Sequence, residues 1–90
     1  MRKIEQQMVE AVKANKNWKG GNTEVVPCGD QVDVYLHGNH IATIPWHDPI
    51  YANAQTFHDW PTPTTRSRLR ALGVDASIKN GCAMLDGEEV

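Results

Sequence analysis

The sequence predicts a small α+β domain in which two helices pack on the apolar face of a twisted antiparallel sheet of five or six strands. The expected order is α-β-β-β-(β)-α-β-β. Three observations predict this class: apolar residues near the N-terminus recur with a helical period, short segments alternate around two-residue turns, and a capped helix interrupts those segments. A chain of 90 residues forms one domain, residues 1–90, and still buries a core.

The first predicted element is a helix over residues 2–16. At 100° per residue its apolar side chains form one stripe, which consists of Met1, Ile4, Met8, Ala11 and Val12. Asn15, Asn17 and Gly20-Gly21 are residues that end helices. We expect this helix to cover the core.

Three strands are predicted next, at residues 23–28, 31–37 and 40–46. They are separated by Gly29-Asp30 and Gly38-Asn39, which are typical two-residue hairpin loops. Loops of that length pair His37 with His40, Leu36 with Ile41, and Val34 with Thr43. The predicted core face carries Val25, Pro27, Val32, Val34, Leu36 and Ile41. The predicted mixed face carries Glu24, Val26, Asp33, Tyr35, His37, His40, Ala42, Ile44 and Trp46.

Residues 48–58 are open to two interpretations. Asp48-Pro49 would suit the start of a helix. Against that, Ile50, Ala52, Ala54 and Thr56 alternate with larger or more polar neighbours and show no period of 3.6. We therefore predict a fourth strand.

A second helix is predicted over residues 63–72. Thr62 suits the N-cap, Pro63 the first helical position, and Gly73 the stop. The expected buried stripe is Thr65, Leu69 and Leu72. Arg66 and Arg70 are expected one turn apart on an exposed face, with Arg68 beside the buried stripe and its charged end reaching solvent.

The chain is predicted to close on a hairpin. Residues 76–79 and 82–85 flank Asn80-Gly81, a strong type I′ turn signal. Residues 86–90 are expected to form a loose acidic tail.

Charge is distributed in alternating blocks although the formal net charge is only -2. Residues 1–19 and 61–72 are basic, whereas residues 20–60 and 73–90 are acidic. The total excludes a strongly basic nucleic-acid coat protein. No signal peptide or membrane-spanning stretch is predicted, and two cysteines, Cys28 and Cys82, favour reduced thiols inside a cell.

Two groups of residues could carry chemistry. His37 and His40 would be close enough across their turn to share a metal, but the histidine spacing matches no standard zinc pattern, and no nucleophile or phosphate-loop motif is present. We therefore expect no cofactor and no enzymatic activity, with a metal or hydrolytic site at His37 and His40 as a distant alternative.

The segment from Trp60 to Arg70 is the sharper signal. Its hydroxyls, helix start and arginines suit an anion or a nucleic acid, with Trp60, Thr64, Thr65, Arg66, Arg68 and Arg70 as candidate residues. The alternative is a capped amphipathic helix whose arginines are solvated or paired with acidic residues. A winged helix-turn-helix would need a further helix just before this one, which only residues 48–58 could supply.

Four stretches together resemble a family of small tailed-phage proteins of uncharacterised function. They are Asn17–Thr23 (NWKGGNT), Leu36–Ala42 (LHGNHIA), Trp60–Leu72 (WPTPTTRSRLRAL) and Ser77–Gly87 (SIKNGCAMLDG). The sequence departs from the family at Gly20-Gly21, where one small residue is usual, and at Arg70, where Asn is frequent. The resemblance implies a phage-encoded accessory protein in the host cytoplasm, not secreted, with no assigned catalytic residue.

The leading hypothesis is a non-enzymatic accessory protein that binds a host or phage protein and modulates host machinery during infection. Its candidate contact residues on the mixed sheet face are Tyr35, His37, His40 and Trp46. The alternative is a nucleic-acid-binding protein that uses the Thr- and Arg-rich helix 62–72.

Overall fold

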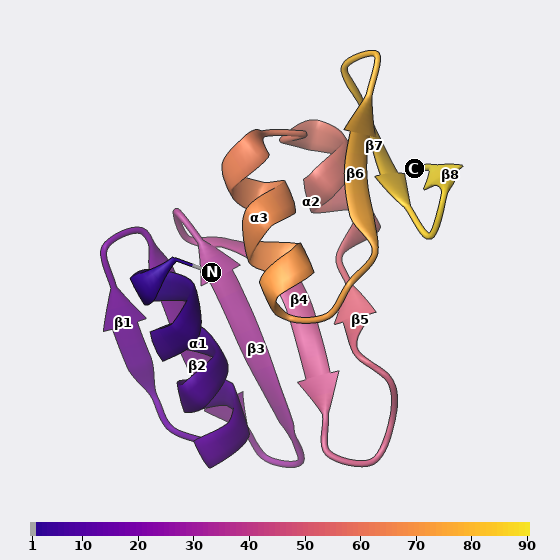
Figure 1. Cartoon of the computed structure of the whole chain (residues 1–90). Coiled ribbons are helices and arrows are strands. Elements are labelled where there is room, and N and C mark those ends of the chain that lie inside the picture. The colour runs from indigo at the N-terminus through magenta and orange to yellow at the C-terminus, as the bar shows by residue number, and fades with distance from the viewer. Residues whose placement is uncertain (1) are drawn as a thin grey trace.

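The computed structural model describes residues 2–90 and confirms the α+β class (Figure 1). Within those residues the helices are α1 (Lys3–Ala14), α2 (Ala54–Asp59) and α3 (Pro63–Ala71). One antiparallel meander contains β1 (Trp18–Gly20), β2 (Thr23–Cys28), β3 (Gln31–Leu36), β4 (Asn39–Pro45) and β5 (Tyr51–Ala52). A second sheet contains β6 (Ala76–Lys79), β7 (Cys82–Leu85) and β8 (Glu88–Glu89). The strands therefore divide into two sheets, and α2 is a helix beyond the two expected.

The helix α1 lies within its predicted range and packs on β2. It ends where Asn15 takes a left-handed conformation (φ 54°), so that its N–H can bond back to the last turn. Met8 and Ala11 are buried as the apolar stripe predicts, while Met1 lies outside the described residues. Glu5 is not part of the predicted apolar stripe, but the structure buries it as well, at 3% exposure.

The short strand β1 is not predicted by the sequence pattern. It pairs with β2 so that Trp18 faces Val25 and Gly20 faces Thr23. A Cβ atom at Gly20 would come within 2.4 Å of the Trp18 ring, so a side chain at this position would force the ring to move. Three residues are too few to show a strand alternation, which is why the pattern misses β1.

The hairpin of β2 and β3 has the predicted loop, because Cys28 pairs with Gln31. The predicted position of the next turn, between β3 and β4, is wrong by one residue. The loop is His37-Gly38, whose φ angles are 53° and 78°, and Leu36 pairs with Asn39. Both loop residues thus take the positive φ that a type I′ turn needs.

A β-bulge then changes the pairing of β3 with β4. Tyr35 faces His40, but Val34 faces Ala42, so Ile41 is the extra residue on β4. The predicted pairing of Val34 with Thr43 is therefore wrong. Because of the bulge, Ile41 and Ala42 are both buried, at 1% and 0% exposure.

The bulge also corrects the assignment of the two sheet faces. Ala42 and Ile44 pair with core-face residues of β3, so they lie on the core face and not on the mixed face. His40 remains on the mixed face beside Tyr35, whereas His37 lies in the turn. The predicted opposition of His37 and His40 is therefore wrong.

The predicted fourth strand over residues 48–58 is wrong apart from β5. The side chain of Asn53 accepts a hydrogen bond from the Thr56 N–H (3.1 Å) and caps α2. The helix then places Phe57 in the core at 1% exposure. Six residues are fewer than two helical turns, so α2 has no period that the sequence could reveal.

The helix α3 begins as predicted. Thr62 accepts the Thr65 N–H (3.2 Å), and Pro63 occupies the first turn. Thr65 and Leu69 are buried as expected. Arg68 is buried too, at 4% exposure, so the expectation that its charged end reaches solvent is wrong.

The C-terminal hairpin has the predicted Asn80-Gly81 loop, but the expected loose tail is wrong. A second turn at Asp86-Gly87, with φ angles of 53° and 80°, brings β8 back onto β7. The Val90 N–H then donates to the Ala83 carbonyl (3.0 Å), and the Val90 side chain packs against the core.

The helices α1 and α3 touch each other and lie on the same face of the meander, as Figure 1 shows. The helix α2 packs against β4 and β7 and so links the two sheets. No helix in residues 2–90 is long and apolar enough to cross a membrane.

Candidate binding surfaces

The structure separates the predicted site residues into distinct places. His37, Trp60, Thr64 and Thr65 line one cleft. Arg66 and Arg70 line a depression between α1 and α3. Tyr35 and His40 lie on the uncovered sheet face. Trp46 borders a third hollow, and Arg68 lies in the interior.

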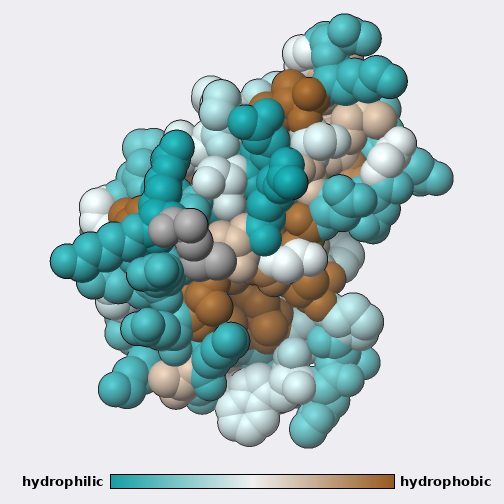
Figure 2. Space-filling model, viewed as in Figure 1, coloured by the Kyte–Doolittle hydropathy of each residue, from teal (hydrophilic) through white to brown (hydrophobic). Residues whose placement is uncertain are grey.

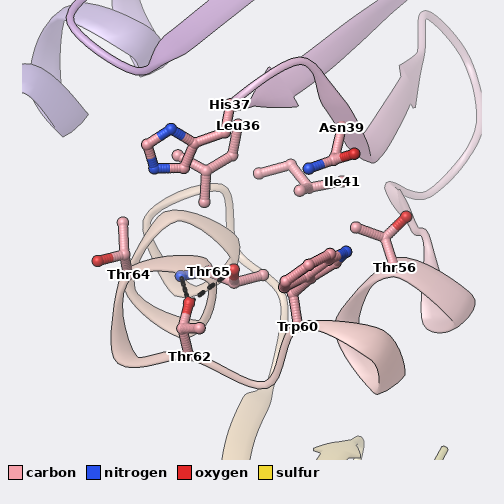
Figure 3. A pocket seen from close by; sticks show the side chains of 9 residues that line it. All are labelled: Leu36, His37, Asn39, Ile41, Thr56, Trp60, Thr62, Thr64 and Thr65. Carbon is pink, nitrogen blue, oxygen red and sulfur yellow. Dashed lines mark hydrogen bonds between the residues drawn. The ribbon is translucent and has the colours of Figure 1, made fainter.

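The cleft has a volume of about 360 Å³ and lies where the β3–β4 turn meets the end of α2 and the start of α3 (Figure 3). Its lining residues are Leu36, His37, Asn39, Ile41, Thr56, Trp60, Thr62, Thr64 and Thr65. Trp60 forms one side and is 57% exposed. Two of the threonines are already engaged, because the Thr62 and Thr65 hydroxyls lie 3.0 Å apart. The cleft thus combines an exposed aromatic ring with aliphatic and hydroxyl groups.

On the uncovered sheet face, His40 is the centre of a hydrogen-bond network. Asn53 Nδ2 lies 2.9 Å from His40 Nδ1, and the other nitrogen, Nε2, lies 2.8 Å from Thr43 Oγ1. Thr43 in turn donates to Asp33 (2.8 Å). Since the Asn53 oxygen is occupied by the N-cap bond, its amide nitrogen donates to Nδ1, and His40 carries its proton on Nε2.

This direction of hydrogen bonding determines what the network can do chemically. Thr43 gives its only proton to Asp33 and receives one from His40. His40 is therefore not placed to remove a proton from Thr43, as activation of a nucleophile would require. The network fixes the start of α2 on β4 through Asn53.

Cys28 and Tyr35 lie near Asp33 on the same face. Partial desolvation, followed by the hydrogen bond and charge of Asp33, raises the pKa of the Cys28 thiol. Desolvation and the nearby Asp33 charge also raise the pKa of Tyr35. Both groups are held protonated at neutral pH, and a protonated thiol is a poor nucleophile.

The arginine expected to serve as a contact residue instead forms a buried ion pair. Arg68 donates from Nη1 to Glu5 Oε2 (2.8 Å) and from Nε to Thr23 Oγ1 (3.0 Å). The Ser67 hydroxyl donates a hydrogen bond to the same carboxylate oxygen. Desolvation would raise the pKa of Glu5, but the hydrogen bonds from Ser67 and Arg68 and the Arg68 charge outweigh it and lower that pKa.

The depression between α1 and α3 has a volume of about 380 Å³. Its lining residues are Arg2, Glu5, Pro63, Arg66, Ser67, Arg70 and Ala71. Sequence reasoning identified Arg66 and Arg70 but missed Arg2 and Glu5. The signal for Glu5 was present, because this carboxylate lies at the edge of the apolar stripe of α1.

A third hollow, of about 410 Å³, lies where α1 ends beside β3 and β4. Val12, Val32, Ile44, Pro45 and Trp46 line it together with Lys13 and Asn15. Figure 2 shows apolar surface gathered over the strands between α1 and α3 on the helix-bearing face. Trp46 is 57% exposed, as Trp60 is, but it lies in a different hollow and not with Tyr35 and His40.

Among residues 2–90, no group of three or more His, Cys, Asp or Glu side chains is arranged to hold a metal ion. The metal site considered for His37 and His40 required the two side chains to lie opposite each other. They do not, because His37 lines the cleft whereas His40 lies beside Tyr35 on the other face of the sheet.

The fold and its surfaces define a small α+β domain with a tryptophan-sided cleft and an arginine-lined depression. The chain belongs to the Kyanoviridae Gp96 protein family, whose sequence profile matches residues 1–89. It is thus a small phage-encoded protein, as the resemblance implied, and the family description names no activity. No curated protein and no solved structure matches the chain.

Proposed function

We propose that this phage protein is a non-enzymatic accessory protein that binds a host or phage protein in the host cytoplasm during infection. The observation that carries the proposal is the exposure of Trp60 beside the cleft. Tryptophan is among the residues that contribute most to protein interfaces, especially where it stands beside a pocket.

The shape and chemistry of the cleft favour a side chain of a partner protein. Leu36 and Ile41 supply aliphatic contacts opposite Trp60, while His37 and Asn39 supply polar groups from the turn. The cleft is open to solvent on one side, so it would leave part of a small ligand exposed. An apolar side chain presented by a protein surface would fill the hollow and cover the indole ring at the same time.

The area of Trp60 indicates how much such binding could contribute. An exposure of 57% corresponds to about 140 Å² for a tryptophan of about 250 Å². At about 25 cal/mol per Å², covering this area contributes about 3.5 kcal/mol. Replacement of Trp60 by Ala should therefore weaken binding by about 30-fold or more, the effect of losing about 2 kcal/mol.

The network around His40 supports a non-enzymatic role. Its hydrogen bonds run from Asn53 through His40 and Thr43 to Asp33, so His40 is not placed to take the proton of the Thr43 hydroxyl. The raised pKa of the Cys28 thiol also supports a non-enzymatic role, because it disfavours the nucleophilic thiolate.

The test compares W60A with W46A, because the two tryptophans are equally exposed and lie in different hollows. Tagged wild-type, W60A and W46A proteins are used for capture from cells infected with the encoding phage, with quantitative mass spectrometry as the readout. Each candidate partner is then purified and titrated against all three proteins by calorimetry.

We expect a partner that binds the wild type and W46A with similar affinity and binds W60A about 30-fold or more weakly. The proposal is contradicted if no captured protein depends on Trp60, or if the purified partner binds W60A as tightly as the wild type. Circular dichroism of both variants checks that they remain folded.

A further inference from the structure

We propose that the depression between α1 and α3 is a second binding site, which takes the phosphate backbone of a nucleic acid. The depression lies apart from the Trp60 cleft and is lined by different residues. This proposal therefore does not depend on the proposed protein-binding function. Arg2, Arg66 and Arg70 are its anion-binding groups.

The first step of the argument is the charge balance within the depression. Glu5 is the carboxylate that lines it, and this carboxylate is already paired with Arg68 and hydrogen-bonded to Ser67. Within residues 2–90 no carboxylate lies within ion-pair distance of Arg2, Arg66 or Arg70. The buried pair thus uses the local negative charge internally and leaves the surrounding guanidinium groups positive.

The second step is the arrangement of those arginines. Arg66 and Arg70 are one turn apart on α3, and Arg2 adjoins the depression from the N-cap of α1. Figure 2 shows a column of hydrophilic side chains over α3. Arginine offers bidentate donors that match phosphate oxygens, and several arginines on one flank suit a ligand with repeating charges.

The third step is the character of the lining, which favours nucleic acid over a protein partner. Protein interfaces have an apolar core, whereas nucleic-acid interfaces are polar and positively charged. The lining of this depression is mainly arginine, Ser67 and Glu5, with only Pro63 and Ala71 as small apolar contributions. The exposed tryptophans lie at the other two hollows.

The surrounding helices indicate contact with the backbone and not base reading. The helix α2 does precede α3, with residues 60–62 between them, as a winged helix-turn-helix would require. However, α2 packs against β4 and β7, while α3 packs against α1, β4 and β6. A recognition motif needs its two helices packed together so that the second enters the major groove. We therefore expect binding that is independent of base sequence.

The test measures fluorescence anisotropy of a labelled 20-nucleotide single strand and of the matching duplex, at 50 and 200 mM salt. Three phosphate contacts predict that wild-type duplex affinity falls about 40-fold between these concentrations, from a slope of about -0.9 per contact. In R66A/R70A one contact remains, so the same change of salt should weaken binding only about 3.5-fold. Affinity at 50 mM salt should fall at least about tenfold in that variant.

Two variants serve as controls. K16A/K19A removes the same charge from exposed positions elsewhere, so it should retain most of the affinity if the arginines form a site. R66K/R70K keeps the charge but loses the bidentate geometry, and it should bind between the wild type and R66A/R70A.

The inference is overturned if neither strand form binds at 50 mM salt, or if K16A/K19A loses as much affinity as R66A/R70A. It is also overturned if poly-glutamate displaces the oligonucleotide at equal charge concentration, because the depression would then prefer carboxylates. Retention of the wild-type circular dichroism spectrum by R66A/R70A assigns its loss of binding to the site.

Discussion

The buried ion pair between Glu5 and Arg68 predicts that its two partners are not equally costly to remove. In E5L, Arg68 keeps its charge, since a guanidinium does not deprotonate in proteins. Removing one partner of a buried pair in this way costs about 3–5 kcal/mol. In R68M, Glu5 can instead take up a proton and become neutral.

The cost of leaving Glu5 unpaired in R68M therefore has an upper limit. Protonating a carboxyl of ordinary pKa 4.5 at pH 7 spans about 2.5 pH units, which at about 1.36 kcal/mol per unit is about 3.4 kcal/mol. Ser67 remains as a hydrogen-bond partner for the neutral carboxyl. The double variant E5L/R68M removes both charges and should recover most of the loss, to within about 1–2 kcal/mol of the wild type.

The sign of the pH dependence distinguishes the variants further. In the wild type the folded-state pKa of Glu5 is lowered, so its stabilisation is complete above pH 4.5 and is lost as the pH falls through that lowered pKa. In R68M we expect the folded-state pKa of Glu5 to rise above its ordinary value, because Arg68 no longer offsets the effect of burial. Relative to the wild type, R68M should therefore gain up to about 2.7 kcal/mol between pH 7 and pH 5.

Urea unfolding followed by tryptophan fluorescence at pH 7 and pH 5 measures these free energies for all four proteins. The expected order at pH 7 is wild type and E5L/R68M above R68M, with E5L lowest. The reasoning is refuted if E5L/R68M is less stable than both single variants, or if R68M gains nothing relative to the wild type at pH 5.

The short helix α2 provides two further predictions. Phe57→Ala should cost about 3–5 kcal/mol of unfolding free energy because Phe57 is 1% exposed, whereas Tyr51→Ala, at a position 64% exposed, should cost less than about 1 kcal/mol; equal losses in urea unfolding would contradict this placement of α2. Asn53→Ala removes both the cap of α2 and the bond to His40, and should cost about 1–2 kcal/mol; amide hydrogen exchange at Thr56 and Phe57 should accelerate, and unchanged exchange would show that the cap contributes nothing.

Elements with a strong local signal agree with the sequence prediction. α1 follows from its apolar stripe, α3 from Thr62 and Pro63, and the last hairpin from Asn80-Gly81. The cap of α3 and the turn of the last hairpin act over a few residues, through hydrogen bonds or φ preferences that the local chain can satisfy by itself, and the stripe of α1 is a periodicity within one segment.

Elements that depend on distant partners differ from the prediction. The bulge at Ile41 allows both Ile41 and Ala42 to be buried, which alternation along one strand does not reveal. β8 forms only because β7 offers it an edge, so five residues of acidic sequence look like a free tail.

The candidate site shows the same division. Arg66 and Arg70 were recognised from the spacing on one helix, and Trp60 from its position before the cap. The pairing of Glu5 with Arg68 joins residues 63 positions apart, and only the packing of α1 against α3 brings them together. The turn at His37-Gly38 likewise places His37 beside the Trp60 cleft and separates it from His40.

The sequence by itself thus determined the α+β class, the two long helices and the hairpin loops at Gly29-Asp30 and Asn80-Gly81, because caps, turns and periodicity are local properties of the chain. Tertiary structure alone decided that Arg68 is buried in an ion pair while Arg66 and Arg70 line the depression. It also decided that His37 lines the cleft. The reason is that burial and ion pairing depend on segments far apart in the chain, whose contact no local pattern records.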